Sequence, residues 1–194
     1  MRVISGYLKG KSIKYLKNSK TRPLKDIVKE NLFNIIHHSK YFKIKINEAK
    51  ILDLYSGIGS FGIECVSRGA KKVVFIEKDN QAVETLRRNL TQHSILNKTK
   101  IINGEIEKNI KYLKNEKFNI FFLDPPYADK NYIETLNLIK EYKIIEKDHL
   151  VIIHRENKSS EDLYKLLNVI FMKEYGRSKL IFALFNLDNF ELKL

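Results

Sequence analysis

The sequence is poor in the features that cross-link small secreted proteins or anchor a chain in a membrane. Its single cysteine, Cys65, excludes an internal disulfide, and its five histidines have no cysteine or histidine partners at zinc-finger spacing. No stretch approaches the ~18 consecutive apolar residues of a membrane helix, and the first residues lack the apolar run of a signal peptide. We therefore expect a reduced cytoplasmic protein with no metal and no membrane partner.

The length and charge of the chain limit its organisation and its partners. Its 194 residues, 43% of them apolar, suffice for one well-packed core but are few for two full domains. Residues 1–50 hold 13 Lys or Arg against 3 Asp or Glu, a balance of +10, whereas residues 51–194 hold 23 against 20, a balance of +3. A uniform compositional bias would spread evenly, so the basic N-terminal quarter favours contact with nucleic-acid phosphates over a merely solvated basic face.

The first 20 residues predict a basic β-hairpin extension, and residues 21–194 predict the main domain. Strand-forming residues alternate loosely over residues 1–16 around a central glycine. Beyond a short polar link, apolar residues recur at helical spacing from Pro23 to about His38. We therefore expect the chain to begin with a hairpin and one helix.

From residue 50 onward, short apolar runs alternate with helical patterns, which is typical of a parallel α/β sheet. Strands are predicted at 51–55, 72–77, 100–102, 119–124, 150–154, 169–175 and 179–187, and helices at about 60–68, 80–94, 106–114, 131–142 and 160–167. Because only residues 176–178 join the last two strands, no crossover helix fits between them, and they must pair antiparallel. The sequence predicts a seven-stranded, mostly parallel sheet that ends in an antiparallel hairpin.

A glycine loop follows the first of these strands. The stretch LDLYSGIGSFG, residues 52–62, places Gly57, Gly59 and Gly62 in a G-x-G-x-x-G pattern. In nicotinamide-binding proteins this loop and the helix beyond it hold a pyrophosphate. Asp53, at the end of the strand, would repel phosphate, but it would attract the cationic sulfonium and ammonium groups of S-adenosylmethionine, which has no phosphate. The loop therefore favours S-adenosylmethionine over NAD.

The second strand of the parallel sheet also ends in an acid. Glu77 lies 20 residues after Gly57, where a carboxylate can accept hydrogen bonds from the ribose hydroxyls of a nucleoside. Such an acid occurs in nicotinamide-binding folds too, and a solvated charge at a strand end is the plain alternative. Glu77 therefore supports a nucleoside ligand without choosing which one.

The stretch FFLDPPY, residues 121–127, bears on the substrate. Two prolines directly after a buried strand lack the N–H groups of a ladder and force a rigid exit at the carboxyl edge of the sheet. A plain strand-ending turn is one interpretation. However, Asp124, the carbonyl of Pro125 and the ring of Tyr127 also provide what an exocyclic amine of a nucleobase needs, namely hydrogen-bond acceptors and a stacking surface. This interpretation predicts a base-modifying site.

The loop D-x-x-S-G-x-G-x-x-G, the acid of the second strand and D-P-P-Y together resemble the S-adenosylmethionine-dependent amino-methyltransferases. Three stretches narrow the resemblance: TRPLKDIVKENLFNII (21–36), ECVSRGAKKVVFIEKD (64–79) and FFLDPPY (121–127). With these, nearly the whole chain resembles the bacterial family that methylates N2 of guanine 966 in 16S rRNA. The resemblance implies a Rossmann-like class I methyltransferase fold.

The same resemblance implies ligands and site residues. The cofactor is S-adenosylmethionine, with S-adenosylhomocysteine as product and no metal; the substrate is 16S rRNA or the small ribosomal subunit, and the protein is expected to be a monomer. The implied cofactor-binding residues are Asp53, Tyr55, Ser56, Gly57, Gly59, Glu77, Lys78, Glu105 and Asp124. The implied catalytic residues are Asp124, Pro125, Pro126 and Tyr127. At Gly104-Glu105 the sequence departs from the Gly-Asp pair usual in such enzymes, where the acid contacts the adenine amine.

Basic residues of the N-terminal quarter are the candidates for RNA contact. Lys9, Lys11 and Lys14 of the predicted hairpin are expected to meet phosphates together. Arg22 has two possible partners, an RNA phosphate or the carboxylate of the cofactor. Cys65, within the helix after the glycine loop, is expected to be a small buried apolar residue rather than a nucleophile.

Three functions remain open at the level of the sequence. An rRNA guanine-N2 methyltransferase is favoured. An amino-methyltransferase of another RNA base or of DNA adenine is the second, although 194 residues leave no room for a large target-recognition domain on DNA. A catalytically silent RNA-binding or assembly protein on the same fold is the third. The acids Asp53, Glu77 and Asp124 favour catalysis.

Overall fold

The computed structural model describes residues 1–16, 26–159 and 162–187. Within them the helices are α1 (Asp26–His38), α2 (Ser60–Ser67), α3 (Asn80–Gln92), α4 (Ile106–Asn109) and α5 (Tyr132–Glu141), with short 3₁₀ turns at Leu96–Lys98 and Ile110–Leu113. The strands are β1 (Lys50–Leu54), β2 (Lys72–Glu77), β3 (Thr99–Asn103), β4 (Phe118–Leu123), β5 (Ile145–Glu156), β6 (Leu167–Tyr175) and β7 (Ser178–Phe185).

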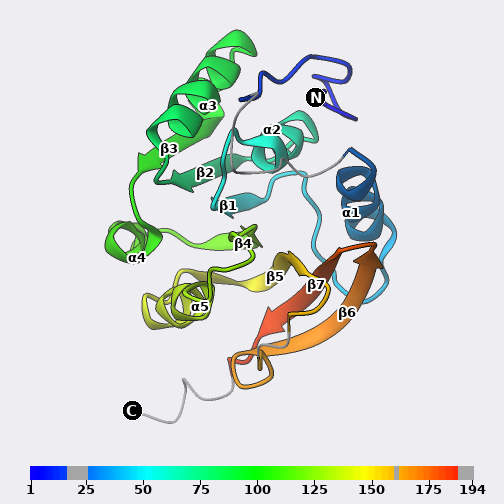
Figure 1. Ribbon diagram of the computed structural model, residues 1–194, viewed down its shortest axis with the longest axis vertical. Coiled ribbons are helices and arrows are strands. Elements are labelled where there is room, and N and C mark those ends of the chain that lie inside the picture. Colours follow the sequence, from blue (N-terminus) through cyan, green and yellow to red (C-terminus); the bar gives the residue numbers. More distant parts are fainter. Residues whose placement is uncertain (17–25, 160–161, 188–194) are drawn as a thin grey trace.

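All seven strands form one sheet in the order β3-β2-β1-β4-β5-β7-β6 (Figure 1). Strands β1 to β5 are parallel, whereas β7 runs antiparallel to both β5 and β6. The predicted mostly parallel sheet with a terminal hairpin is confirmed. The chain winds outward from β1 to β3 and then returns to β4, so the strand order reverses between β1 and β4. Ligands of open α/β sheets bind at such a reversal, beyond the carboxyl ends of the strands.

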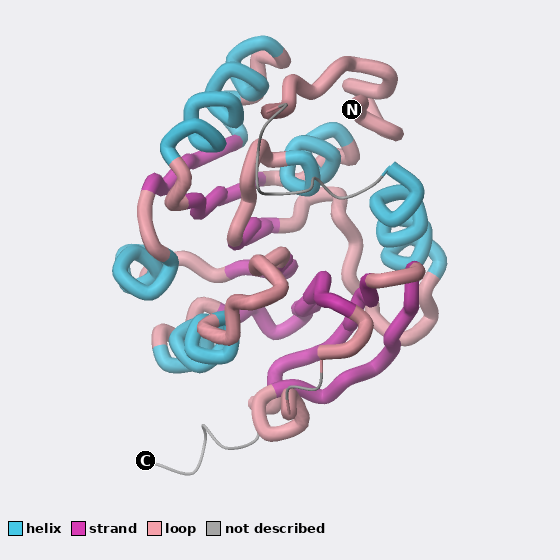
Figure 2. Tube along the Cα trace, in the orientation of Figure 1, coloured by secondary structure: helices cyan, strands magenta, loops and turns pink. Residues whose placement is uncertain are grey.

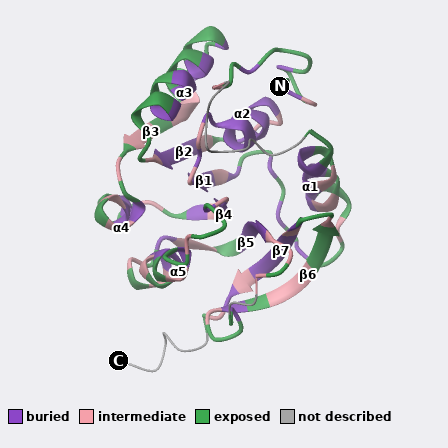
Figure 3. Cartoon of the chain, in the orientation of Figure 1, coloured by how far each residue is buried: buried purple, intermediate pink, exposed green. Residues whose placement is uncertain are grey.

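Helices cover both faces of the sheet (Figures 1 and 2). Buried residues of α1, α2 and α3 pack in one apolar cluster, and those of α4 and α5 pack in another. Neighbouring residues of one strand contribute to opposite clusters, as Val73 and Val74 of β2 do, because side chains alternate across a sheet. The central strands β1, β2, β4, β5 and β7 are largely buried, whereas the edge strands β3 and β6 are mostly half-buried or exposed (Figure 3). No helix in the described part of the chain is both long and apolar enough to cross a bilayer.

The N-terminal arm, residues 1–16, is packed against the body of the protein. Its residues Val3, Leu8 and Ile13 are buried in the same cluster as α1, α2 and α3. The arm folds back on itself as a short hairpin: an antiparallel bridge joins Arg2 to Ser12, the N–H of Val3 donates to the carbonyl of Lys11 and the N–H of Ile13 donates to that of Met1, both at 2.9 Å, although no regular strand forms. Side chains of the body bind other parts of its backbone.

Those side chains come largely from α2. The carboxylate of Glu64, which is fully buried, accepts hydrogen bonds from the backbone N–H groups of Ile4 (2.7 Å) and Ser5 (2.9 Å). The hydroxyl of Ser67 accepts another from the N–H of Leu8 at 2.9 Å. The arm is therefore fixed to α2 through its backbone, which leaves its lysine side chains free to face solvent.

One predicted helix is wrong. Residues 160–161 lie outside the described part, but residues 162–166 form turns, and β6 begins at Leu167. The carboxylate of Asp162 accepts a hydrogen bond from the N–H of Tyr164 at 3.2 Å, and the N–H groups of Leu166 and Leu167 donate to the carbonyl of Leu163, so a single turn forms before β6 begins. Elsewhere the predicted elements are confirmed with shifted ends; β5, for example, starts at Ile145 instead of Leu150. The predicted helix start at Pro23 lies outside the described residues.

Candidate active site

The register of the parallel strands brings the predicted site residues to one level. Leu54 of β1 pairs with Ile76 of β2 and with Leu123 of β4, and Leu123 pairs with Ile153 of β5. The residues that follow these four are Tyr55, Glu77, Asp124 and His154, which therefore form a row across the carboxyl edge of the sheet. Three of them were predicted from the sequence, and His154 was not.

The glycine loop between β1 and α2 has two kinds of glycine. Gly59 has φ +82°, and a Cβ there would lie 2.3 Å from the Cδ1 of Leu86, so this glycine is required by packing. Gly57 has φ +52°, but a Cβ there would meet no atom within 4 Å. The backbone at Gly57 therefore faces open space, in which a ligand can approach closely.

Asp53 lies beneath this loop rather than at its mouth. Its side chain is buried, with 1% exposed, and Oδ2 accepts a hydrogen bond from the N–H of Gly62 at 3.0 Å. Burial raises the pKa of Asp53 well above its usual range, Asp124 and Glu77 raise it further, and the Gly62 bond opposes them. Oδ1 has no hydrogen-bond partner among the described residues. The expectation that Asp53 presents its charge to the cofactor at the end of the strand is corrected: Asp53 is buried and fastens the start of α2.

Glu77 is held by three backbone N–H groups at the end of β2. Its Oε2 accepts from Gly57 at 2.7 Å, and its Oε1 accepts from Lys78 at 2.9 Å and Asp79 at 2.8 Å. A carboxylate offers about four acceptor positions, so one remains for a ligand. Lys78 contributes its backbone to this arrangement, while its side chain is exposed. The strand end is thus shaped to present a fixed acceptor.

Two further predicted cofactor residues lie near this strand end: Ser56 is in the glycine loop, and Glu105 follows the end of β3. The hydroxyl oxygen of Ser56 is buried and has no hydrogen-bond partner in the described part of the chain. Glu105 lies just before α4 with its side chain 49% exposed, and it forms an ion pair with Lys108 at 2.6 Å. The hydrogen bond and the charge of Lys108 lower the pKa of Glu105. Lys108 contacts only Oε2 of Glu105, and no hydrogen bond holds Oε1 within the described ranges.

Asp124 and Tyr127 bracket the two prolines after β4. Oδ1 of Asp124 lies 2.8 Å from Nδ1 of His154, and no hydrogen bond holds its Oδ2 within the described ranges. Tyr127 is 46% exposed, and its ring meets that of His154 edge-on with centroids 6.4 Å apart. Pro125 is buried and Pro126 exposed. A carboxylate oxygen and an aromatic ring therefore both remain accessible at this edge.

Two residues of β5 hold this loop, and the sequence interpretation missed both. The buried guanidinium of Arg155 donates to the carbonyls of Pro126 at 3.0 Å and Tyr127 at 3.1 Å, and it lies over the ring of Tyr132 at 4.7 Å. His154 binds Asp124 as described. A signal was available, because the predicted strand 150–154 ends at His154 and follows the strand that ends at Asp124.

The predicted RNA contacts lie on the N-terminal arm. The side chains of Lys9, Lys11 and Lys14 are exposed, and Arg22 lies outside the described residues. Asn89 of α3, fully buried, exchanges hydrogen bonds with the backbone of Lys14 at 2.9 and 3.1 Å and also donates to the carbonyl of Ile58 at 3.3 Å. Because Ile58 belongs to the glycine loop, one side chain links the arm to that loop.

Cys65 and a surface pocket were the remaining candidates for chemistry among the residues that the structure describes. Cys65 is fully buried, and burial raises its pKa well above the usual range, so its prediction as a buried apolar residue is confirmed. The described residues contain no group of three or more His, Cys, Asp or Glu side chains that could hold a metal.

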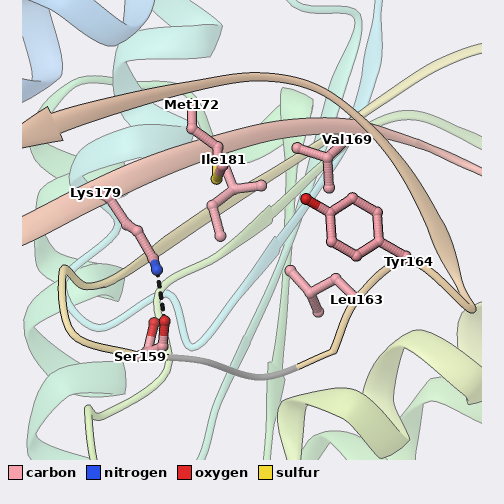
Figure 4. Close-up of a pocket in the computed structure, with 7 residues that line it drawn as sticks. All are labelled: Ser159, Leu163, Tyr164, Val169, Met172, Lys179 and Ile181. Atoms are coloured by element: carbon pink, nitrogen blue, oxygen red, sulfur yellow. Dashed lines mark hydrogen bonds between the residues drawn. The ribbon is translucent and has the colours of Figure 1, made fainter.

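A pocket of about 250 Å³ lies over β6 and β7 (Figure 4), and it is lined by Ser159, Leu163, Tyr164, Val169, Met172, Lys179 and Ile181. None of these residues belongs to the row at the carboxyl edge.

Comparison with known proteins places nearly the whole chain in one group. The model of the family described as "Conserved hypothetical protein 95" matches residues 1–184. A protein of Bacillus subtilis named "Putative rRNA methyltransferase YlbH" is 34% identical over 160 residues, which cover 81% of this chain and 84% of that protein. "Ribosomal RNA small subunit methyltransferase D" of Buchnera aphidicola (strain Bp) is 31% identical over 193 residues, 98% of this chain and 94% of that protein.

A solved structure agrees with these relatives. The crystal structure described as "putative methylase HI0767 from Haemophilus influenzae" superposes with a TM-score of 0.74 at 27% identity, over 94% of this chain and 96% of that one. The fold is therefore the Rossmann-like fold of the class I methyltransferases.

Proposed function

Because the chain belongs to the family described as Conserved hypothetical protein 95, we propose that it methylates the exocyclic N2 amine of a guanine in 16S rRNA, using S-adenosylmethionine. The expected target is guanine 966, and the expected product of the cofactor is S-adenosylhomocysteine. Its relatives named as rRNA methyltransferases support the substrate class. The observation that carries the proposal is the row in which Glu77 and Asp124 stand level on either side of Tyr55.

The residues at β1 and β2 fit S-adenosylmethionine. This cofactor supplies a methyl group on a cationic sulfur, which becomes a neutral thioether after transfer. Glu77 offers its remaining acceptor position to a ribose hydroxyl. The backbone at Gly57 faces open space in which the cofactor can lie. The buried hydroxyl of Ser56 has a hydrogen-bonding capacity that no described residue satisfies. Glu105 would contact the adenine amine through Oε1, the oxygen that Lys108 does not contact. Tyr55, Gly59 and Lys78 complete the proposed cofactor site.

The residues after β4 fit the amine of a base. The lone pair of this amine is delocalised into the ring, which makes it a weak nucleophile. Oδ2 of Asp124 and the carbonyl of Pro125, neither hydrogen-bonded within the described ranges, would accept its two hydrogens and favour a nitrogen whose lone pair points out of the ring plane. The N–C bond forms as the C–S bond breaks, with its electron pair left on sulfur. One amine proton then departs to solvent, with Asp124 as first acceptor.

The remaining residues of the base site position the target. The exposed ring of Tyr127 would stack on the base after it leaves its helix or loop, and Pro126 keeps the exit from β4 rigid. Lys9, Lys11 and Lys14, with Arg22, would bind rRNA phosphates. We expect a monomer that acts in the cytoplasm on 16S rRNA or on the small ribosomal subunit.

Purified protein tests the function on unmodified 16S rRNA and on small subunits, with S-adenosylmethionine that carries a labelled methyl group. Digestion to nucleosides and mass spectrometry should detect N2-methylguanosine. Label on adenosine would instead favour an amino-methyltransferase of another base, since the Asp-Pro-Pro-Tyr motif can bind the exocyclic amines of several bases. RNA binding without any methylated nucleoside would favour the catalytically silent alternative.

A further inference from the structure

His154 is a partner of Asp124 to which the proposed reaction gives no role. It follows Ile153, which pairs with Leu123, so it stands level with Asp124 in the β4–β5 ladder. Nδ1 of its ring lies 2.8 Å from Asp124 Oδ1, and only 11% of its side chain is exposed. The ring also meets Tyr127 edge-on. The imidazole therefore contacts both side chains that bracket the prolines.

The hydrogen bond assigns the tautomer of this ring. An ionised carboxylate only accepts hydrogen bonds, so the hydrogen lies on Nδ1 of His154. Nε2 is buried, and in the described part of the chain it has no hydrogen-bond partner. A hydrogen on Nε2 would be a buried donor without an acceptor, which is unfavourable. The ring therefore donates through Nδ1 and keeps a lone pair on Nε2.

Strand β5 holds the loop after β4 at two points. Arg155 donates to the carbonyls of Pro126 and Tyr127, while His154 donates to the Asp124 side chain. Consecutive strand residues point to opposite faces, so the two contacts restrain the loop from different sides. One contact fixes the backbone and the other fixes the carboxylate. Oδ2 of Asp124 is the oxygen left for a substrate.

We propose that His154 is a positioning residue for methyl transfer: it holds the Asp124 carboxylate so that Oδ2 faces the exocyclic amine. The inference rests on the proposed function. Rotation about the last bond of an aspartate side chain is otherwise only weakly restricted. With Oδ1 held, the amine meets an acceptor at a fixed place, which speeds the transfer step without changing cofactor affinity.

Two amide variants separate the roles of the two ring nitrogens. The amide nitrogen of asparagine reaches about as far as Nδ1, and that of glutamine about as far as Nε2. His154→Asn therefore keeps a donor for Asp124, whereas His154→Gln misplaces it and His154→Leu removes it. In single-turnover assays on 16S rRNA we expect the Leu and Gln variants to be about 10-fold to 100-fold slower and the Asn variant to stay within about 3-fold of wild type. S-adenosylmethionine affinity should be unchanged in all three.

His149 provides a matched control on the same strand. It is also buried, but its ring bonds only to backbone groups, with Nδ1 near the carbonyl of Glu146 and Nε2 accepting from the N–H of Phe185 at 2.9 Å. His149→Asn should lower stability without slowing the transfer step of the folded protein. A near-wild-type transfer rate in His154→Gln together with a slow rate in His154→Asn would overturn the proposal, because Nε2 would then be the ring nitrogen that methyl transfer needs. A wild-type rate in His154→Leu would overturn it as well.

Nitrogen-15 NMR of the imidazole gives a readout independent of activity. We expect His154 to carry its hydrogen on Nδ1 and to lose this preference in Asp124→Ala. A hydrogen on Nε2 would overturn the proposal even if rRNA is methylated. A wild-type protein with the expected tautomer that methylates no rRNA would instead contradict the proposed function.

Discussion

The two halves of the sheet edge are held together by different groups. In the cofactor half, at the ends of β1 and β2, backbone N–H groups bind the carboxylates of Asp53 and Glu77. In the base half, at the ends of β4 and β5, the side chain of His154 binds Asp124, and the side chain of Arg155 binds the loop carbonyls. The cofactor half therefore depends on local backbone conformation, and the base half depends on a neighbouring strand.

Asp53 of β1 and the residues that follow β4 also differ in exposure. Asp53 is 1% exposed, whereas 24% of the Asp124 side chain and 46% of Tyr127 are accessible. A small ligand can be enclosed by backbone, but a base that belongs to a large RNA must enter from outside. The difference is what a site for one small and one very large substrate requires, and it predicts that the halves can be damaged separately.

Removal of the Asp124 carboxylate should have the largest effect and should be confined to the base half. Asp124→Ala should slow methyl transfer at least about 100-fold, because the amine loses a preorganised acceptor. S-adenosylmethionine affinity should change less than about twofold. Single-turnover transfer and calorimetric titration measure the two effects. Asp129→Ala, in the same loop, is the control and should stay active; near-normal transfer by Asp124→Ala would refute the assigned role.

Two glycine variants should divide the cofactor half into packing and binding. Gly59→Ala places a Cβ against Leu86 at positive φ and should cost about 1–3 kcal/mol of stability. Gly57→Ala also has positive φ but meets no atom, so it should cost about 1–2 kcal/mol and mainly weaken S-adenosylmethionine binding. Urea unfolding and calorimetry distinguish them. Unchanged cofactor affinity in Gly57→Ala would show that the ligand does not approach this backbone.

The same division explains how far the sequence predicted this site. Apolar runs revealed the strands, and the glycines and Glu77 lie within one βαβ unit, where spacing along the chain indicates proximity. His154 is 30 residues from Asp124, so its contact depends on the β4–β5 register, which no local pattern specifies. The burial of Asp53 likewise depends on how α2 packs, and the binding of the arm by Glu64 and Asn89 joins segments 59–75 residues apart.

The helix predicted at 160–167 failed for a related reason. Its apolar spacing resembled that of a helix, but the residues described there, 162–166, form turns, and Leu163 is buried beneath them. Leu163 and Leu167 are both buried, but Leu167 already belongs to β6, so too few packed positions remain between the strands for tertiary contacts to stabilise a helix.

Asp53→Asn should produce a smaller, pH-dependent effect within the cofactor half. Because the folded pKa of Asp53 is raised, the folded state binds its proton more tightly, so wild-type stability falls as pH rises from about 4 toward the folded pKa. Asparagine cannot ionise and keeps an oxygen for the Gly62 N–H. The variant should therefore be more stable than wild type at neutral pH, whereas S-adenosylmethionine affinity should change little, because the Asp53 side chain is buried beneath the glycine loop. Urea unfolding from pH 4 to 8 tests this, and parallel pH profiles would contradict it.

The N-terminal arm should respond least, since its lysines are exposed and distributed. Simultaneous Lys9→Gln, Lys11→Gln and Lys14→Gln should weaken RNA binding and lower the slope of log affinity against log salt by roughly 0.7–0.9 for each phosphate that is no longer neutralised. Cofactor affinity should be unchanged, because the arm backbone is held independently of these side chains. An unaltered salt slope would place the RNA-binding surface elsewhere, for example around Asp124 to Tyr127.

Mass mapping of methylated nucleosides in 16S rRNA tests the central claim most directly. The rRNA should come from cells that lack the gene for this protein, complemented with wild type or with Asp124→Ala. We expect N2-methylguanosine to be missing at the target guanine in the deletion, restored by wild type and not restored by Asp124→Ala. Full methylation of 16S rRNA in the deletion, or restoration by Asp124→Ala, would contradict it.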